Sequence, residues 1–430
     1  MTDTSSPAPS PVDAFVAAVY ARDVDRVRSL LESEPDVAPR INDPLFHFDS
    51  PAVFEARGNL PLLDVLLEHG ADLNRKTSWK LGGFGILETI DPDLAGPLID
   101  RGAEVDIHAA SNLGRLERVR ELLDADPELV HSKGGDGKRP LHSARTVDIA
   151  RLLLERGADL EARCDDHGST AAHYLIGSVP EVAAYLVDRG AVTDVMLLSA
   201  LGDVARLRQL LDAEPDAVHS RITPERFPGP EQAAGHIYEW TIGRGFSPHR
   251  AAHGFGQDDA LALLLERSDA RERLLAGLWI GRRDLVDDAL ESDPGLVATF
   301  EEGDLRELAD AARDNETAVV SAMLEVGFPI TSRGQHGATP LHWSAFHGNA
   351  DMTARILEHD PPLELVDGDG HGTPLGWALH GAGHGWNLAG HDYPRTVSRL
   401  LEAGCNHEAF RGSGVAEVDA VLERFREEDS

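Results

Sequence analysis

Histidine is concentrated near the end of the chain, where nine of its 20 histidines lie between His336 and His407. Neutral imidazole is a common ligand of transition metals, and a glycine-rich segment could wrap around an ion. The segment 380–394 combines both features with large aromatic rings, and its candidate binding residues are His380, His384, Trp386, His391 and Tyr393. This composition suits a binding loop, with a metal ion as one candidate ligand.

The metal interpretation depends on whether His380 and His384 share one face of a helix. Gly381, Gly383 and Gly385 disfavour a helix at this point. The chain also has neither a CxxC nor an HExxH motif. The sequence therefore predicts no metal ligand set and no cofactor, and metal binding by this loop stands as the third functional alternative.

A second group of aromatic and polar residues lies in the segment 221–249. Recognition pockets typically combine aromatic rings, side chains that end in a hydrogen-bonding group, and a permanently charged arginine. The alternative is that the rings fold onto the neighbouring helices as a small local core. The candidate binding residues are His236, Tyr238, Trp240 and Arg244, followed by Phe246 and His249.

The sequence contains no recognised motif for nucleophilic catalysis or phosphate binding. GGDGKRP from Gly134 resembles a fragment of a P-loop, but Arg139 stands where serine or threonine is required. Ser132 likewise stands where the first glycine should be. Because GxSxG and GxGxxG are also missing, no catalytic residue is predicted.

The charge balance argues against two classes of partner. The 74 acidic and 40 basic residues give a net charge of -34, which repels phosphate backbones and anionic lipid heads. Neither nucleic acid nor membrane is therefore an expected partner. Cys164 and Cys405 are predicted to be free thiols, and the sequence has no signal-peptide pattern and no long apolar run, so a cytoplasmic location is expected.

One sequence pattern recurs along the chain: an apolar helical segment with two leucines, followed by an acidic residue and a turn. Some copies turn at proline, and six turn at a glycine that suits the left-handed position just past a helix end: Gly70, Gly102, Gly157, Gly190, Gly327 and Gly404. Together the copies predict second helices that end at about residues 35, 70, 102, 127, 157, 190, 215, 267, 294, 327, 360 and 404.

The opening half of the repeat is clearest in HGATPLHWSAFHGNADMTARILEHD from His336. Thr339 to His342 supply TPLH, in which threonine caps the helix and proline occupies its first turn. This segment resembles the ankyrin repeat, and the chain is similar to divergent members of that family of the bacterial or archaeal type. Weaker versions begin at Asp136 and His167. In this family the histidine equivalent to His342 hydrogen-bonds between adjacent repeats.

The resemblance implies an all-α fold, an ankyrin-type α-solenoid of about twelve helix-turn-helix units with two loop insertions. Three units, which begin near His108, Leu197 and Leu274, lack the TPLH turn and should follow the preceding pair without a hairpin. The expected organisation is a flexible tail at 1–12, repeats at 13–220, an insertion at 221–249, further repeats at 250–410 with a His/Gly-rich insertion at 380–394, and a capping helix at 411–430.

The same resemblance implies a non-catalytic scaffold that binds an unknown protein partner through its concave face, its hairpin tips and the two insertions. Trp343 and Phe346 join the candidate contact residues, because large aromatic rings contribute disproportionately to binding. The alternative is an enzyme or a small-molecule-binding protein with a pocket between the insertions, built from His236, Arg244, His380, His384, Asp392 and Tyr393.

Overall fold

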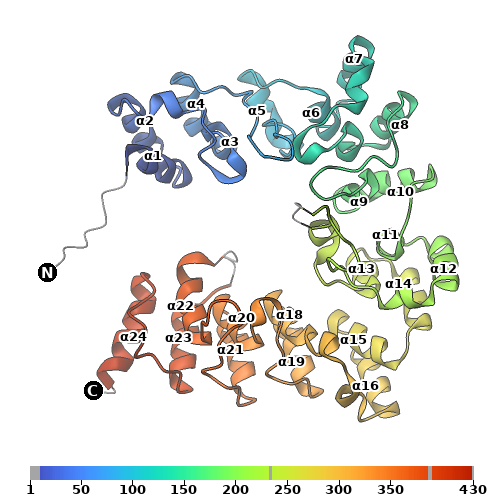
Figure 1. Ribbon diagram of the computed structural model, residues 1–430, viewed down its shortest axis with the longest axis vertical. Coiled ribbons are helices and arrows are strands. Elements are labelled where there is room, and N and C mark those ends of the chain that lie inside the picture. The colour runs from blue at the N-terminus through green and yellow to red at the C-terminus, as the bar shows by residue number, and fades with distance from the viewer. Residues whose placement is uncertain (1–9, 232–234, 386–389, 429–430) are drawn as a thin grey trace. The chain divides into compact units, whose positions relative to one another are not determined.

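The computed structural model describes residues 10–231, 235–385 and 390–428. The chain forms two compact units, Met1–Leu263 and Leu264–Ser430. Within the described ranges every regular element is a helix, apart from one isolated bridge between Phe46 and Ser50 (Figure 1). The predicted all-α class is confirmed.

The helices are short, as expected for elements that depend on their neighbours for stability. The first unit contains α1 (Pro11–Tyr20), α2 (Val24–Ser33), α3 (Ala52–Ala56), α4 (Leu60–Glu68), α5 (Ala95–Asp100), α6 (Ile107–Asn112), α7 (Leu116–Ala125), α8 (Val147–Glu155), α9 (Ala171–Leu175), α10 (Pro180–Asp188), α11 (Val195–Leu201), α12 (Val204–Ala213) and α13 (Pro248–Gly254). After α14 (Asp258–Arg267), the second contains α15 (Ala270–Ile280), α16 (Arg283–Ser292), α17 (Glu302–Leu305), α18 (Glu307–Arg313), α19 (Thr317–Glu325), α20 (Pro340–Phe346), α21 (Ala350–Leu357), α22 (Pro374–His384), α23 (Tyr393–Glu402) and α24 (Ala416–Glu428).

The predicted helix endings agree closely with the structure. Each has a helix that ends within three residues of it, from α2 at Ser33 to α23 at Glu402. The six turn glycines all have positive φ, between 89° and 105°. At the end of α4, for example, the N–H of Ala71 donates to the carbonyl of Leu66 at 3.0 Å, which satisfies a carbonyl left open by the helix end.

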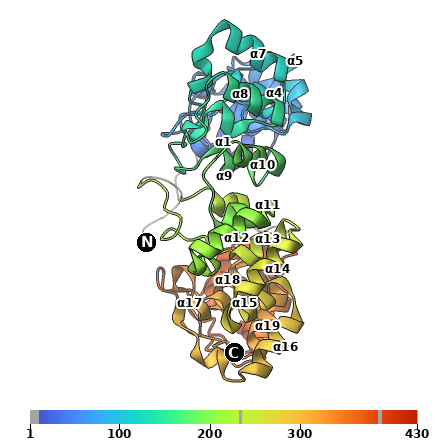
Figure 2. The same ribbon diagram turned by 90° about the vertical axis from the view of Figure 1, so that its right-hand side faces the viewer.

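Successive pairs stack in two rows. In the second unit α20 contacts both α18 and α22, while α21 contacts both α19 and α23 (Figure 1). In the turned view of Figure 2, α15 lies with α16 and α19, which it contacts. Within this part of the second unit, a helix pair is therefore packed against the pair before it and the pair after it.

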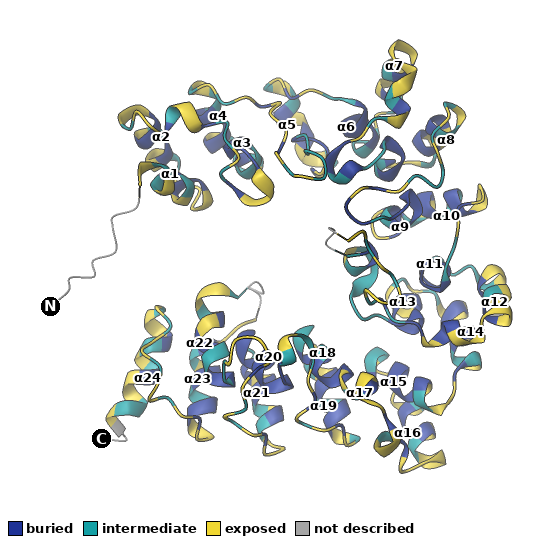
Figure 3. Ribbon diagram, in the orientation of Figure 1, coloured by how far each residue is buried: buried dark blue, intermediate teal, exposed yellow. Residues whose placement is uncertain are grey.

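The core of each unit runs along this stack. Dark residues in Figure 3 lie where helices face one another, and exposed residues concentrate along the outer helices such as α7 and α12. In the second unit Leu308, Met352 and Val397 are completely buried although they come from three successive pairs. Within the described residues, no helix combines the length and apolar character needed to cross a bilayer.

The histidine of the TPLH turn joins neighbouring repeats, as the family resemblance implies. His342 accepts from the N–H of Thr339 through Nδ1 at 3.2 Å, and its Nε2 lies 3.1 Å from the carbonyl of Gly372 in the next repeat. His142 forms the same pair of contacts with Arg139 N–H and the Ser169 carbonyl, each at 3.2 Å. Because a carbonyl only accepts, Nε2 carries the proton in both rings.

Several expected boundaries differ from the structure. Helix α1 begins at Pro11, so the last residues of the expected tail are helical, whereas residues 1–9 lie outside the described part of the chain. The expected insertion at 221–249 overlaps α13, because Ser247 caps a helix that starts at Pro248. The division into units falls at Leu263, so this insertion and α13 belong to the first unit.

The buried His142 makes stability depend on pH. Burial lowers the pKa of His142 to about 3, below the value of about 6.5 in an unfolded chain. A group with a depressed pKa binds more protons when unfolded, so its contribution is complete above about pH 6.5 and is lost as the pH falls toward 3. When the pH falls from 7 to 5, we expect wild type to lose about 2 kcal/mol more of its free energy of unfolding than His142→Asn loses, because asparagine does not titrate.

Chemical denaturation at the two pH values, followed by circular dichroism, measures this difference. His131→Asn is the matched control, because His131 is exposed at the end of a neighbouring turn. If the difference in free energy of unfolding between wild type and His142→Asn stays the same at both pH values, the assignment of His142 as a neutral histidine between repeats is contradicted.

Candidate functional site

The insertion after α12 folds onto the first unit. Ile237 N–H donates to Ser169 Oγ at 3.3 Å, and Thr241 Oγ1 donates to the His173 carbonyl at 3.3 Å. The Tyr238 hydroxyl donates to Asp194 Oδ2 at 2.9 Å. Asp194 also caps the start of α11 through the N–H groups of Met196 and Leu197, so the insertion is tied to a helix end.

Two of the predicted contact residues are interior residues of this small core. Tyr238 is 0% exposed and His236 is 5% exposed, with their rings 4.5 Å apart. Burial lowers the pKa of His236 to about 3 and raises the pKa of Asp194. The prediction that His236 and Tyr238 present a binding surface is therefore corrected, because their faces are covered by Phe227 and His173.

Two other residues of the insertion reach the surface. Trp240 is 58% exposed, with its ring 4.8 Å from the ring of His167. Arg244 Nε lies 2.9 Å from Glu239 Oε2. These side chains stay candidates for partner contact, whereas the body of the insertion is a packed element.

The second histidine-rich segment is more helical than its glycines suggest. Helix α22 runs to His384, so His380 and His384 lie one turn apart with their rings stacked 4.4 Å apart. A side chain at Gly381 would place its Cβ 2.2 Å from the Phe346 carbonyl. The expectation of a broken helix is wrong, because Gly381 allows α22 to approach α20 closely rather than interrupting α22.

The remaining candidate residues of this segment differ in their burial and contacts. Tyr393 is buried, and its hydroxyl donates to the Phe346 carbonyl at 2.8 Å, so it fixes α23 against α20 instead of facing a partner. His391 is exposed, with its ring 5.2 Å from that of Tyr393. Trp386 lies outside the described residues. In the described part of the segment, no third ligand joins His380 and His384 in a possible metal cluster.

A pocket of about 590 Å³ lies beside α20 and α22 in the second unit. The rings of Trp343 and Trp377 meet edge to face there, 5.0 Å apart with an interplanar angle of 86°. Trp343 is only 2% exposed and Phe346 is also buried, so these two predicted contact residues are mainly core residues that form the floor. The lining residues are His336, Trp343, Phe346, Asp367, Asp369, Gly370, Gly372, Gly376, Trp377, His380 and Phe410.

Two carboxylates line the pocket, Asp367 in its buried part and Asp369 at the surface. Asp367 accepts from Trp377 Nε1 at 2.7 Å and from four backbone N–H groups of the turn that follows it. Burial alone would raise the pKa of Asp367, but the hydrogen bonds from Gly370 N–H and Trp377 outweigh it and hold the pKa at about 2. The Asp369 carboxylate pairs with His336 Nδ1 at 2.5 Å.

Sequence reasoning missed Trp377, Asp367 and Asp369. A signal was present, because Trp343 and Trp377 occupy the same position after TPL in two successive repeats. Stacking the repeats therefore brings the two indoles together. The pocket expected between the two insertions stays a hypothesis, since the insertions belong to different units.

The packing of the insertion predicts unequal effects of two aromatic substitutions. Tyr238→Phe removes a buried hydrogen bond and leaves Asp194 with one donor fewer, so we expect a loss of about 1–3 kcal/mol in the free energy of unfolding. Trp240→Ala should change it by less than about 1 kcal/mol, because the ring is mainly in solvent. Denaturant titration followed by circular dichroism measures both, and equal losses would contradict this assignment.

Comparison with known families agrees with the geometry. Residues 107–196 match the family model for three copies of the ankyrin repeat, and residues 336–367 match the model for a single ankyrin repeat. The second match covers α20 and α21, and α20 carries Trp343 and Phe346 on the floor of the pocket.

Curated relatives are similar over parts of the chain. "Ankyrin repeat and SAM domain-containing protein 6" of Mus musculus is 33% identical over 121 residues, which are 27% of this chain and 14% of the relative. "Ankyrin repeat and SOCS box protein 6" of Pongo abelii is 26% identical over 175 residues, 37% of this chain and 36% of the relative. The chain thus spans a small part of the first relative and about a third of the second. The TPLH turns, the turn glycines and these matches show that the chain contains ankyrin repeats.

Proposed function

We propose that the chain is a non-catalytic scaffold that binds a protein partner, and that the pocket beside α20 and α22 is its principal docking site. The observation that carries the proposal is the aromatic pocket itself, with Trp343, Phe346 and Trp377 around a volume of about 590 Å³. Aromatic anchors in desolvated pockets dominate the energetics of most interfaces.

The chemistry of the pocket favours a cationic side chain of the partner. Indole faces attract ammonium and guanidinium groups through their quadrupole. Asp367 and Asp369 add negative charge to the lining, and the chain as a whole carries a net charge of -34. Electrostatic complementarity of this kind speeds encounter and selects basic over acidic partners.

The relatives support a scaffold in general terms only, since each is similar to a limited segment. A cytoplasmic location is part of the proposal. It is supported by Cys164 and Cys405, both buried free thiols, because oxidising compartments favour disulfides. A small cationic molecule in the same pocket is the second candidate, and it shares the aromatic and acidic recognition chemistry.

The test uses a pool of degenerate, fluorescently labelled peptides with one central arginine or lysine, and a matched pool with glutamine at that position. In anisotropy titrations the wild-type chain should prefer the basic pool. Trp377→Ala should weaken this binding about 30-fold, the loss typical of an interface anchor. Trp377→Phe should retain part of the affinity because it keeps an aromatic wall.

Phe48→Ala is the matched control, because it removes an aromatic ring that is 67% exposed from the other unit and should leave the affinity unchanged. Equal binding of the two pools, or full binding by Trp377→Ala, would refute the proposed site. Saturable binding of tetramethylammonium without any affinity for the basic peptides would select the small-molecule candidate.

A further inference from the structure

Three side chains from two successive hairpin tips of the first unit converge on one point. Asp136 lies at the tip of the hairpin 134–138, and Asp166 and His167 lie at the tip of the next hairpin, 164–169. One ligand atom from each lies within 4.8 Å of the other two. His167 Nε2 and Asp166 Oδ2 are 3.5 Å apart.

The backbone builds this approach. The N–H groups of Asp165 and Asp166 both donate to the carbonyl of Asp136, at 2.9 Å and 3.2 Å. Asp136 itself has a left-handed φ of 59°, a conformation that short polar residues adopt more readily than most. The two hairpin tips are therefore joined by main-chain hydrogen bonds, and the side chains meet as a consequence.

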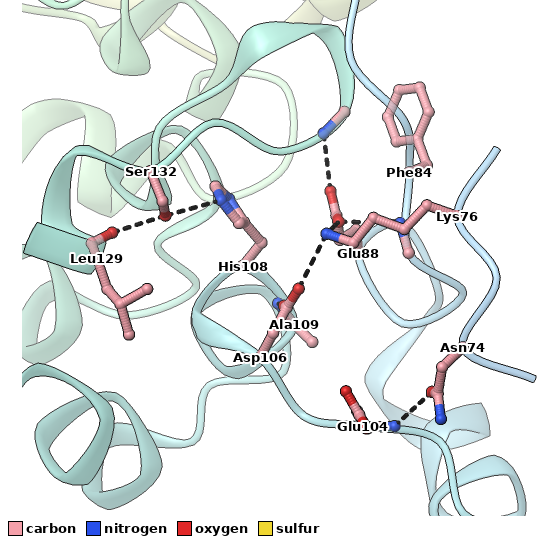
Figure 4. Close-up of polar contacts among 12 residues, drawn as sticks. Asn74, Lys76, Phe84, Glu88, Glu104, Asp106, His108, Ala109, Leu129 and Ser132 are labelled. Carbon is pink, nitrogen blue, oxygen red and sulfur yellow. Dashed lines mark hydrogen bonds and ion pairs between the residues drawn. The ribbon is translucent and has the colours of Figure 1, made fainter. Parts of the chain in front are cut away.

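A loop that precedes the first hairpin anchors it from the other side. Figure 4 shows the buried carboxylate of Glu88 between Lys76 and the hairpin, where its Oε2 accepts from the N–H of Gly135 at 2.9 Å. Gly135 also lies so close to the Phe84 ring that a Cβ would clash with it. The residue before Asp136 is thus fixed, which limits the movement of the tip.

The orientation of the imidazole is also determined. His167 Nδ1 lies 2.7 Å from the carbonyl of Gly235 in the insertion, and a carbonyl only accepts hydrogen bonds. Nδ1 therefore carries the proton of the neutral ring, and the lone pair of Nε2 is directed to the side of the carboxylates. Histidines that bind metals typically donate their second N–H in this way.

One carboxylate oxygen has no protein partner in the described structure. Asp166 is 5% exposed, and its Oδ1 is buried without a hydrogen bond among the described residues. A buried carboxylate that lacks compensation carries a large desolvation cost.

We propose that Asp136, Asp166 and His167 bind a divalent first-row transition ion of the Zn²⁺ and Mn²⁺ class. Two carboxylate oxygens and one imidazole nitrogen form a ligand set that these ions accept, and water completes the coordination. Ligand atoms about 2.1 Å from a tetrahedral ion are about 3.4 Å apart, which matches the separation of Asp166 Oδ2 and His167 Nε2.

The ion has a structural role in this proposal. It links two ankyrin hairpins to each other and, through the hydrogen bond between His167 and Gly235, to the insertion. Cys164 is not part of the ligand set, because its Sγ accepts from the His167 N–H and the Tyr174 hydroxyl, each at 3.2 Å.

The test uses the full chain, purified without a histidine tag and stripped with a chelator. Competition with a chromophoric chelator should show one tight Zn²⁺ or Mn²⁺ site, and Co²⁺ should give visible d–d absorption bands. Asp166→Asn and His167→Ala should each weaken binding at least about 100-fold and abolish the Co²⁺ bands, since even outer-shell changes cost 10- to 100-fold. Asp136→Asn is a third variant. Because Asp136 is only half-buried, this substitution should disturb folding less than the other two.

Two variants of the second unit serve as controls. His384→Ala disrupts the stacked histidine pair on α22, and Asp369→Asn disrupts the pair of His336 and Asp369, which offers only two ligands. Both variants should keep the tight site. Added metal should raise their unfolding temperature as it raises that of wild type. The proposal is overturned if no tight site is found, if all three site variants retain it, or if His384→Ala removes it.

Discussion

In the described part of the chain, a helix pair does not bury its apolar stripe without its neighbours, and the rest of the structure follows from that constraint. The helices are short, and residues such as Met352 and Ile356 reach complete burial only because α21 is packed between α19 and α23. Each pair must therefore arrive in the correct position for the next one. Turn glycines and TPLH joints supply that positioning through backbone geometry and directional hydrogen bonds.

Histidine has two separate functions in this arrangement. His142 and His342 are neutral joints whose two ring nitrogens connect one repeat to the next, and burial depresses the pKa of both rings. His380 and His384 instead lie on an exposed helix face. Some of the histidines thus belong to the repeat itself, and only individual geometry separates structural rings from rings that could bind a ligand.

The proposed sites lie at hairpins and at the helices next to them. There the solenoid leaves polar groups that the apolar core does not need, such as Asp136 at one tip and Asp369 beyond another. The stacking of repeats brings equivalent positions together, so Trp343 meets Trp377 and the tip of one hairpin meets the next. A regular array can therefore assemble a pocket or a ligand set from residues that are distant in sequence.

The sequence by itself determined the helix endings, the repeat and its family, because these depend on local signals: paired leucines, a turn glycine or proline, and a capping threonine before proline. Only the tertiary structure decided which side chains are accessible. Tyr238 and Trp240 are two positions apart, yet Tyr238 is buried and hydrogen-bonded to Asp194, whereas Trp240 is exposed. Gly381 permits helix contact where a local rule predicted a break, and Asp136 meets His167 through hydrogen bonds between hairpins. Local propensity depends on neighbours in the chain, whereas burial and site geometry depend on which distant segments pack together.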